Sequence, residues 1–113
     1  MIVGIGTDLI EVNRIERALE RWGERFARKI LVDHEYERFA RHRKRAHYLA
    51  KRFAAKEAFS KAMGTGIRHP VNWQNVGVAN LPSGKPVLRF APALAALIER
   101  RGIVSVHVTL TDE

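Results

Sequence analysis

The chain has 113 residues, of which 46% are hydrophobic, so it can build one core and we expect a single domain over residues 1–113. Twenty Lys and Arg against twelve Asp and Glu give a formal charge of +8, which favours an anionic partner. The absence of cysteine excludes a disulfide framework, a thiol nucleophile and a cysteine-ligated zinc site. No stretch reaches the roughly 20 apolar residues that span a bilayer, and no leader is recognisable, so a cytoplasmic protein is expected.

The first predicted elements are a buried strand and a long helix. Residues 2–6 combine β-branched side chains with two glycines, which indicates a strand approached closely by another backbone or a ligand, and Asp8 follows at its end. Apolar side chains then recur at spacings of three and four, which predicts one helix over about 10–30: Ile15, Leu19, Trp22, Phe26 and Ile30.

Two further helices are expected before the middle of the chain. A turn near Asp33 precedes a helix through Tyr36 and Phe39, and the charged run 41–45 leads into a helix over about 46–63. Glycines follow at positions 64 and 66, where the left-handed conformation of a helix end costs glycine least.

The C-terminal part is predicted to be a hairpin, a short helix and a strand. Residues 76–81 and 87–90 flank a turn-rich segment, 82–86, and Pro92 opens a helix that ends at Gly102. Alternating valines in 103–110 indicate a last strand. The order of elements predicts an α+β fold with helices packed on one side of a mostly antiparallel sheet.

The third helix carries an acidic residue in an unexpected position. Its small and apolar residues at 46, 50, 53 and 54 form a stripe that Glu57 and Lys61 continue, which predicts that both face the core. A carboxylate there is costly unless it is paired or bound to a cation. One interpretation is an ordinary ion pair between Glu57 and Lys61, one turn apart at the edge of the core.

The other interpretation is a metal site. Asp8 alone is equally explained as a turn residue or helix cap. Together, however, Asp8 and Glu57 offer the oxygen ligands that suit Mg²⁺, which keeps positions for water and substrate phosphates. Lys61 would then contact phosphate beside the ion, as phosphoryl transfer requires.

The first helix also carries a basic stripe. Five arginines fall within a sector of about 80° at helical spacing and favour an anionic partner: Arg14, Arg17, Arg21, Arg25 and Arg28. Guanidinium groups on one helix face could dock on carboxylates of an acidic helix or on nucleic-acid phosphates. The alternative function is therefore a small basic nucleic-acid-binding module in which Glu57 is structural.

Two segments decide between these alternatives. Residues 4–11 read GIGTDLIE and residues 52–66 read RFAAKEAFSKAMGTG, and both resemble the signatures of bacterial holo-acyl-carrier-protein synthases. The segments GKP at 84–86 and HVTLT at 107–111 are also similar to that family, so the resemblance covers nearly the whole chain.

The resemblance implies a 4′-phosphopantetheinyl transferase that acts in fatty-acid biosynthesis. A serine hydroxyl of apo-acyl carrier protein attacks the β-phosphate of coenzyme A, which releases adenosine 3′,5′-bisphosphate and leaves holo-carrier protein. Members of this short type form trimers with sites between subunits, and neither nucleic acid nor membrane is an expected partner.

The resemblance also assigns roles to single residues. Asp8 and Glu57 correspond to the magnesium ligands and, with Lys61, form the catalytic set. The residues expected to contact coenzyme A are Arg52, Ser60, Lys61, Gly84, Lys85, Pro86, His107 and Thr109, with Arg43 and Lys44 aligned loosely to nucleotide-phosphate contacts. Arg14, Arg21 and Arg25 are expected to bind the carrier protein. The chain departs from the family at Asp112, where many members have histidine, and ends at Glu113, where the family usually continues into another strand.

Overall fold

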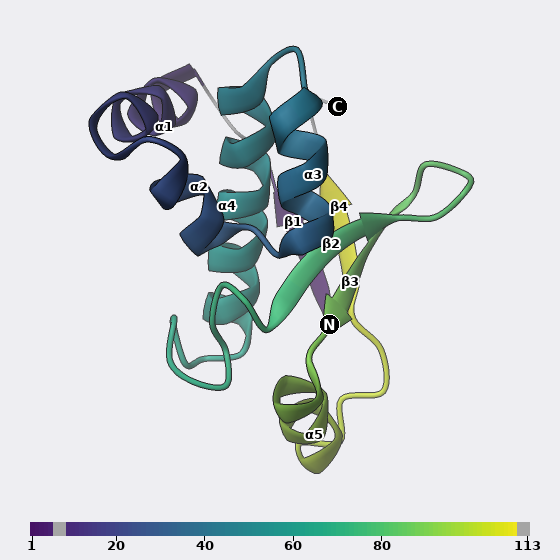
Figure 1. The fold of residues 1–113 in the computed structure, drawn as a ribbon. Helices are drawn as coiled ribbons and strands as arrows, with labels where there is room; N and C mark the ends of the chain where they lie inside the picture. Colours follow the sequence, from purple (N-terminus) through teal and green to yellow (C-terminus); the bar gives the residue numbers. More distant parts are fainter. Residues whose placement is uncertain (6–8, 111–113) are drawn as a thin grey trace.

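A computed structural model describes residues 1–5 and 9–110. Figure 1 shows helices α1 to α4 gathered at one end of the molecule and α5 at the other. In chain order the elements are β1 (Ile2–Ile5), α1 (Leu9–Trp22), α2 (Glu24–Ile30), α3 (Asp33–Arg41), α4 (Arg45–Ala62), β2 (Val76–Asn80), β3 (Pro86–Phe90), α5 (Pro92–Arg100) and β4 (His107–Leu110).

The strands form two pairs. β2 and β3 make the predicted antiparallel hairpin, in which Val76 pairs with Phe90 and Asn80 with Pro86. β1 pairs with β4 in parallel, with Ile2 opposite His107, and β4 also contacts β3. The α+β class is therefore confirmed, and the parallel pair is an addition to the antiparallel pattern predicted. It is possible because the rest of the fold forms the long crossover that parallel strands need.

The predicted helix over 10–30 is two helices, which corrects the sequence interpretation. Gly23 has φ 66°, and its N–H donates to the carbonyl of Leu19 at 2.8 Å, so α1 ends there and α2 begins one residue later. The apolar spacing continues across the break because both helices bury their apolar faces in one cluster, in which Ile15 and Ile30 lie. The hairpin is therefore preceded by four helices rather than three.

The last strand is also shorter than predicted. β4 begins at His107 rather than at residue 103, and Val104 is 98% exposed, whereas Val108 is 6% exposed. Val104 and Val108 therefore do not share a buried face. Alternation alone could not locate the start of pairing, because the loop after Gly102 carries the same valine pattern as the strand.

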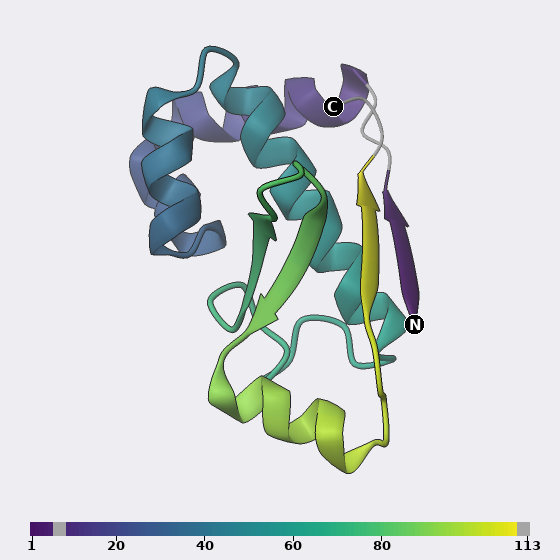
Figure 2. The same ribbon diagram turned by 90° about the vertical axis from the view of Figure 1, so that its right-hand side faces the viewer.

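Two hydrophobic clusters make up the core, and α4 contributes to both. The helical cluster joins α1, α2, α3 and the first half of α4 around Phe39 and Leu49. The strand cluster joins the second half of α4 to the hairpin, α5 and β4 around Phe59 and Leu94. In Figure 2, α4 runs diagonally behind the hairpin from the end that holds α1 to α3 down to the level of the N-terminus. The helix therefore connects the two clusters.

Candidate active site

An open basic cavity of about 1030 Å³ lies between α3, the first half of α4 and the turn between β2 and β3. Its lining contains five cationic side chains and two histidines but no carboxylate among the described residues. The lining residues are Arg38, Arg41, His42, Lys44, His47, Tyr48, Lys51, Arg52, Asn80, Leu81, Pro82 and Gly84. Such a wall attracts anions, because the described lining residues carry positive charge and none of them is acidic.

The turn of the hairpin forms one wall of this cavity. Gly84 has φ 92°, a conformation that glycine adopts without strain, and its carbonyl accepts a hydrogen bond from the Asn80 side chain at 2.9 Å. The Asn80 Oδ1 atom accepts from Arg38 Nη1 of α3 at 3.1 Å. The turn is thereby tied to α3 across the cavity.

Helix α4 contributes the buried wall. Lys51 and Arg52 are 8% and 4% exposed, and the Arg52 guanidinium carbon lies 4.0 Å from the ring centroid of Tyr48. Burial raises the pKa of the Tyr48 phenol above its usual value, and this effect outweighs the opposing charge of Arg52. The phenol therefore keeps its proton at neutral pH.

Behind this wall a buried ion pair connects the elements that surround the cavity. Lys56 Nζ donates to Glu35 Oε1 at 2.7 Å, and both side chains are fully buried. Lys56 also donates to the carbonyls of Ile30 at 2.6 Å and Trp73 at 2.9 Å. Burial lowers the pKa of Lys56, and the Glu35 carboxylate opposes that change.

Glu35 uses both of its oxygens. Oε1 also accepts from the N–H of Val32 at 2.9 Å, at the start of α3, and Oε2 accepts from the N–H of Val78 in β2 at 2.7 Å. The pair of Glu35 and Lys56 thus fixes α2, α3, α4 and the hairpin relative to one another. Sequence reasoning missed it, although Leu49, Arg52, Lys56, Phe59 and Met63 recur at alternate spacings of three and four.

The buried positions of α4 correct the prediction for Glu57 and Lys61. The buried side of α4 runs through Arg52 and Lys56, whereas Glu57 is half-buried beside it and Lys61 is exposed. Within the described part of the chain, Glu57 and Lys61 form no ion pair with each other. The predicted stripe at 46, 50, 53 and 54 suggested a core face because three of its four residues are alanines. Small side chains, however, also suit the edge of a helix that packs closely against a neighbour.

The partner proposed for Glu57 lies outside the described residues, since Asp8 belongs to the segment 6–8. Helix α4 packs against β1, the strand that precedes this segment in the sequence. Among the described residues, no group of three histidine or carboxylate side chains could hold a metal ion.

The residues predicted to contact coenzyme A do not all share one surface. Arg52 and Gly84 line the basic cavity together, and Lys44 lines it as well. Ser60 is buried, and its hydroxyl donates to the Glu57 carbonyl at 2.7 Å. Lys85 follows Gly84 in the turn and Pro86 begins β3, whereas exposed His107 begins β4. The side chain of Thr109 lies outside the described part.

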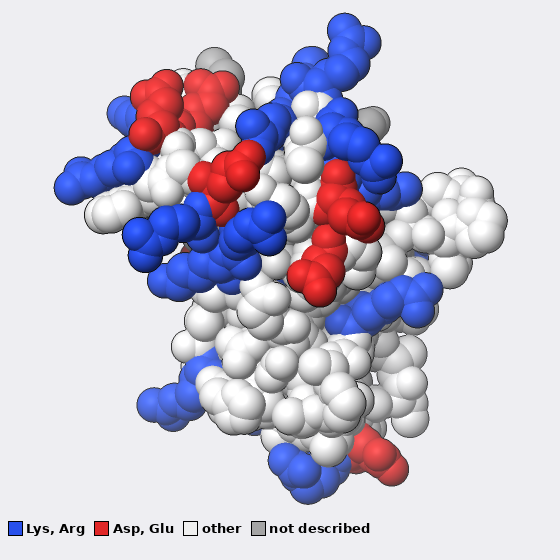
Figure 3. All heavy atoms as spheres, in the orientation of Figure 1, with Lys and Arg blue, Asp and Glu red and all other residues white. Residues whose placement is uncertain are grey.

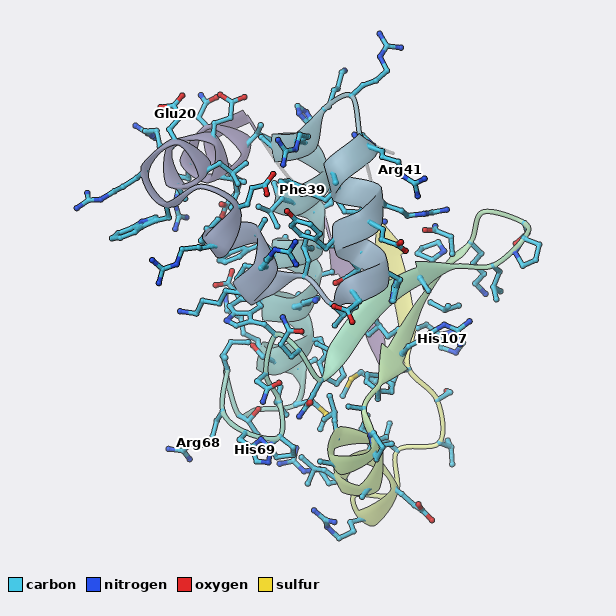
Figure 4. All side chains as sticks on the ribbon, in the orientation of Figure 1. Glu20, Phe39, Arg41, Arg68, His69 and His107 are labelled. Atoms are coloured by element: carbon cyan, nitrogen blue, oxygen red, sulfur yellow. The ribbon has the colours of Figure 1, made fainter. Side chains whose placement is uncertain are left out.

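Figure 4 labels His107 together with side chains in other parts of the molecule. Arg41 projects from α3 toward the side of the hairpin turn, whereas Phe39 of the same helix points between the helices. Arg68 and His69 lie on the loop after α4, on the other side of the molecule from His107.

The predicted basic stripe is divided between two helices. Arg14, Arg17 and Arg21 lie exposed on α1, whereas Arg25 and Arg28 belong to α2 after the break at Gly23. The exposed Arg28 has its guanidinium carbon 3.9 Å from the centroid of the Tyr36 ring, so its side chain packs on α3. In Figure 3 the charged side chains concentrate over the end formed by α1 to α4.

The fold and this cavity define a small α+β protein with a surface suited to a phosphorylated ligand. A model described as the 4′-phosphopantetheinyl transferase superfamily matches residues 4–108. The chain therefore belongs to the 4′-phosphopantetheinyl transferase superfamily.

Individual relatives support the same assignment. A holo-[acyl-carrier-protein] synthase of Nitrosospira multiformis is 52% identical over 113 residues, which cover all of this chain and 90% of the relative. A crystal structure of the synthase from Neisseria meningitidis is 46% identical with a TM-score of 0.87, over all of this chain and 90% of that one. A Bacillus anthracis synthase in complex with CoA (3′,5′-ADP) is 42% identical with a TM-score of 0.63, over 79% of this chain and 76% of that one.

Proposed function

We propose that this chain transfers the 4′-phosphopantetheine arm of coenzyme A to a serine of apo-acyl carrier protein. The observation that carries this proposal is the basic cavity in which Arg52 of the α4 motif and Gly84 of the hairpin turn lie together. Residues 32 positions apart in sequence, each expected to contact coenzyme A, share one surface. The names of the relatives support the same reaction.

In this reaction the serine oxygen forms a bond to the β-phosphorus of coenzyme A, and the phosphoanhydride bond breaks. Adenosine 3′,5′-bisphosphate leaves with the bonding electrons, and the serine proton passes to a base. The residues of the cavity supply binding and charge neutralisation, since Lys51 and Arg52 place buried cations where phosphate oxygens would enter. The product is holo-acyl carrier protein.

We assign a magnesium ion to Asp8 and Glu57. The half-buried Glu57 carboxylate forms no ion pair in the described part of the chain, so it is available as an oxygen ligand. One or two carboxylates suffice for Mg²⁺, which retains several waters. The bound ion would neutralise charge on the reacting phosphates, and Lys61, one turn along α4, would contact the same phosphates.

The carrier protein is proposed to dock on α1 and the start of α2. Arg14 and Arg21 are seven residues apart on α1 and therefore lie on one face, and Arg25 of α2 is also exposed. Exposed guanidinium groups suit an acidic helix, because they can bind carboxylates through two hydrogen bonds.

We further propose a homotrimer with sites between neighbouring subunits, working in fatty-acid biosynthesis in the cytoplasm. Lys61 is exposed and is not among the residues that line the cavity, which suits a site that a neighbouring subunit completes. The exposed Val104 and Leu81 would gain burial in such an assembly. None of the described helices is long and apolar enough to cross a membrane. Sedimentation equilibrium should give three times the chain mass of 12.9 kDa.

Mass spectrometry of apo-acyl carrier protein tests the reaction. After incubation with the chain, coenzyme A and Mg²⁺, the carrier should gain the mass of one phosphopantetheine arm. Chelation of Mg²⁺ or the variant Glu57→Gln should reduce the rate by at least about a hundredfold, because a metal ligand is lost.

Glu99→Gln serves as the matched control, since Glu99 is an exposed glutamate on α5. It should transfer at the rate of the unaltered chain. Transfer that persists in both Glu57→Gln and the chelated sample would refute the magnesium assignment, and no transfer by the unaltered chain would refute the function.

A further inference from the structure

One hydroxyl group in the wall of the basic cavity has no hydrogen-bond acceptor among the described residues. Tyr48 lies in the first turn of α4, is 5% exposed, and lines the cavity. Its Oη atom is buried, and the neighbouring Arg52 guanidinium can only donate to it, so the proton of the hydroxyl is unpaired in the described part of the chain. A buried hydroxyl left unpaired costs roughly 1–3 kcal/mol, a cost that phenylalanine would avoid at this position.

The neighbours of the Tyr48 ring explain its packing but not its hydroxyl. The ring lies 4.0 Å from the Arg52 guanidinium carbon and 5.2 Å from the ring centroid of His42. Phenylalanine could make both contacts, because each involves the ring. The packing of this residue therefore does not require the oxygen.

The cavity offers this hydroxyl few acceptors of its own. Lysine and arginine side chains only donate hydrogen bonds, and they supply five of the twelve lining residues. The Asn80 Oδ1 atom accepts from Arg38, and the His42 Nδ1 atom accepts from the N–H of Lys44 at 2.9 Å. A molecule that enters the open cavity, either water or a ligand, can supply an acceptor for Tyr48.

The charged groups around Tyr48 favour an anion as that ligand. Lys51 and Arg52 are buried beside Tyr48, and the cavity also adjoins the N-terminus of α4, where helix N–H groups favour negative charge. Because burial raises the pKa of Tyr48, the phenol carries its proton at neutral pH and can act as a donor.

We propose that the Tyr48 hydroxyl donates a hydrogen bond to a phosphate oxygen of the nucleotide part of coenzyme A and so contributes to substrate selection. This inference rests on the proposed function for the choice of ligand. It assigns Tyr48, which the sequence did not single out, to the binding surface together with Arg52.

Titration calorimetry with coenzyme A and with adenosine 3′,5′-bisphosphate tests this role on the unaltered chain and on Tyr48→Phe. We expect the variant to bind both ligands on the order of tenfold more weakly, because a hydrogen bond to a charged acceptor is lost. Its melting temperature without ligand should be unchanged or higher, since the hydroxyl donates no hydrogen bond within the described fold.

Tyr36→Phe is the matched control. The Tyr36 hydroxyl donates to Glu24 Oε2 at 2.7 Å, and Tyr36 is not part of the cavity lining. This variant should lose a little stability and keep its affinity for both ligands. A change of affinity equal to that of Tyr48→Phe would overturn the proposal.

The measured affinity decides the outcome. Equal binding by Tyr48→Phe and the unaltered chain overturns the proposal, and so does a failure of the unaltered chain to bind either ligand. Because binding is measured without carrier protein, intact and Tyr48-dependent binding in a chain that fails to transfer would refute the proposed function while leaving this inference in place.

Discussion

The helical cluster and the strand cluster differ in the polar groups that lie against them. In the strand cluster, around Phe59 and Leu94, Ser60 is the buried polar neighbour, and its hydroxyl is satisfied within α4. Four buried charged side chains lie on α3 and α4, the helices that contribute Phe39 and Leu49 to the helical cluster: Glu35, Lys51, Arg52 and Lys56. Glu35 also reaches the strand cluster through the N–H of Val78. All four surround or support the basic cavity.

This difference separates stability from ligand binding. Apolar burial stabilises a fold by about 25 cal/mol per Å² and needs no partner. Buried charges contribute little net stability, because desolvation offsets their attraction, so their presence beside one cavity indicates a role in binding and orientation. Changes in the strand cluster should therefore reduce stability alone, whereas changes near the cavity should also reduce affinity.

The largest effect is expected from Glu35→Ala. It leaves the Lys56 ammonium buried with two carbonyl partners and without its counter-charge. Removing one member of a buried ion pair typically lowers the free energy of unfolding by about 3–5 kcal/mol. Urea denaturation measures this loss, and calorimetry at low temperature should show weaker binding of coenzyme A.

Glu37→Ala, on the exposed face of the same helix, is its control and should change stability by less than about 0.5 kcal/mol. If Glu35→Ala were equally mild, the ion pair would not hold the cavity walls together.

Leu94→Ala tests the strand cluster. Leu94 is fully buried on α5, and truncation should lower the free energy of unfolding by about 2–5 kcal/mol through lost burial and an internal cavity. Affinity for coenzyme A, measured where the variant is folded, should stay within about twofold. The half-buried Leu97 provides a milder comparison on the same helix. A large loss of affinity in Leu94→Ala would contradict the separation of the two clusters.

Arg52→Met tests whether a change at the cavity reduces ligand affinity. Methionine keeps an unbranched apolar side chain over Tyr48 but removes the charge. Affinity for adenosine 3′,5′-bisphosphate should fall about tenfold or more, and its dependence on salt should become weaker. The exposed Arg68, on the loop after α4, is the control site, where substitution by methionine should leave affinity unchanged.

The smallest effect is expected at an exposed contact between α2 and its neighbours. A hydrogen bond from Tyr36 and an ion pair with Arg45 at 3.0 Å lower the pKa of Glu24 below its usual value of 4.5. A depressed carboxylate pKa contributes stability above pH 4.5 and loses it as pH falls through the folded-state pKa. Glu24→Gln should therefore slightly flatten the decline of stability below pH 4.5, as followed by circular dichroism. An unchanged pH profile would show that solvent screens this contact completely.

The sequence by itself determined which segments form most of the helices and strands, and it identified the motif residues. Helix and strand patterns repeat over a few residues, so the hairpin, α3, α4 and α5 could be predicted locally, as could the glycine after α4. Arg52 and Gly84 were also identified from short segments. Glu57 was found in the same way, although its orientation was predicted wrongly, because the alanine stripe gave no information about the neighbouring helix.

Only the tertiary structure decided which distant residues meet. Glu35 and Lys56 are 21 positions apart, and β1 pairs with β4 across about one hundred residues. The cavity likewise requires α3, α4 and the hairpin turn to converge, and the isolation of the Tyr48 hydroxyl exists only once they do. Local periodicity reports which face of an element is apolar, whereas the identity of the opposing face follows from how the whole chain packs.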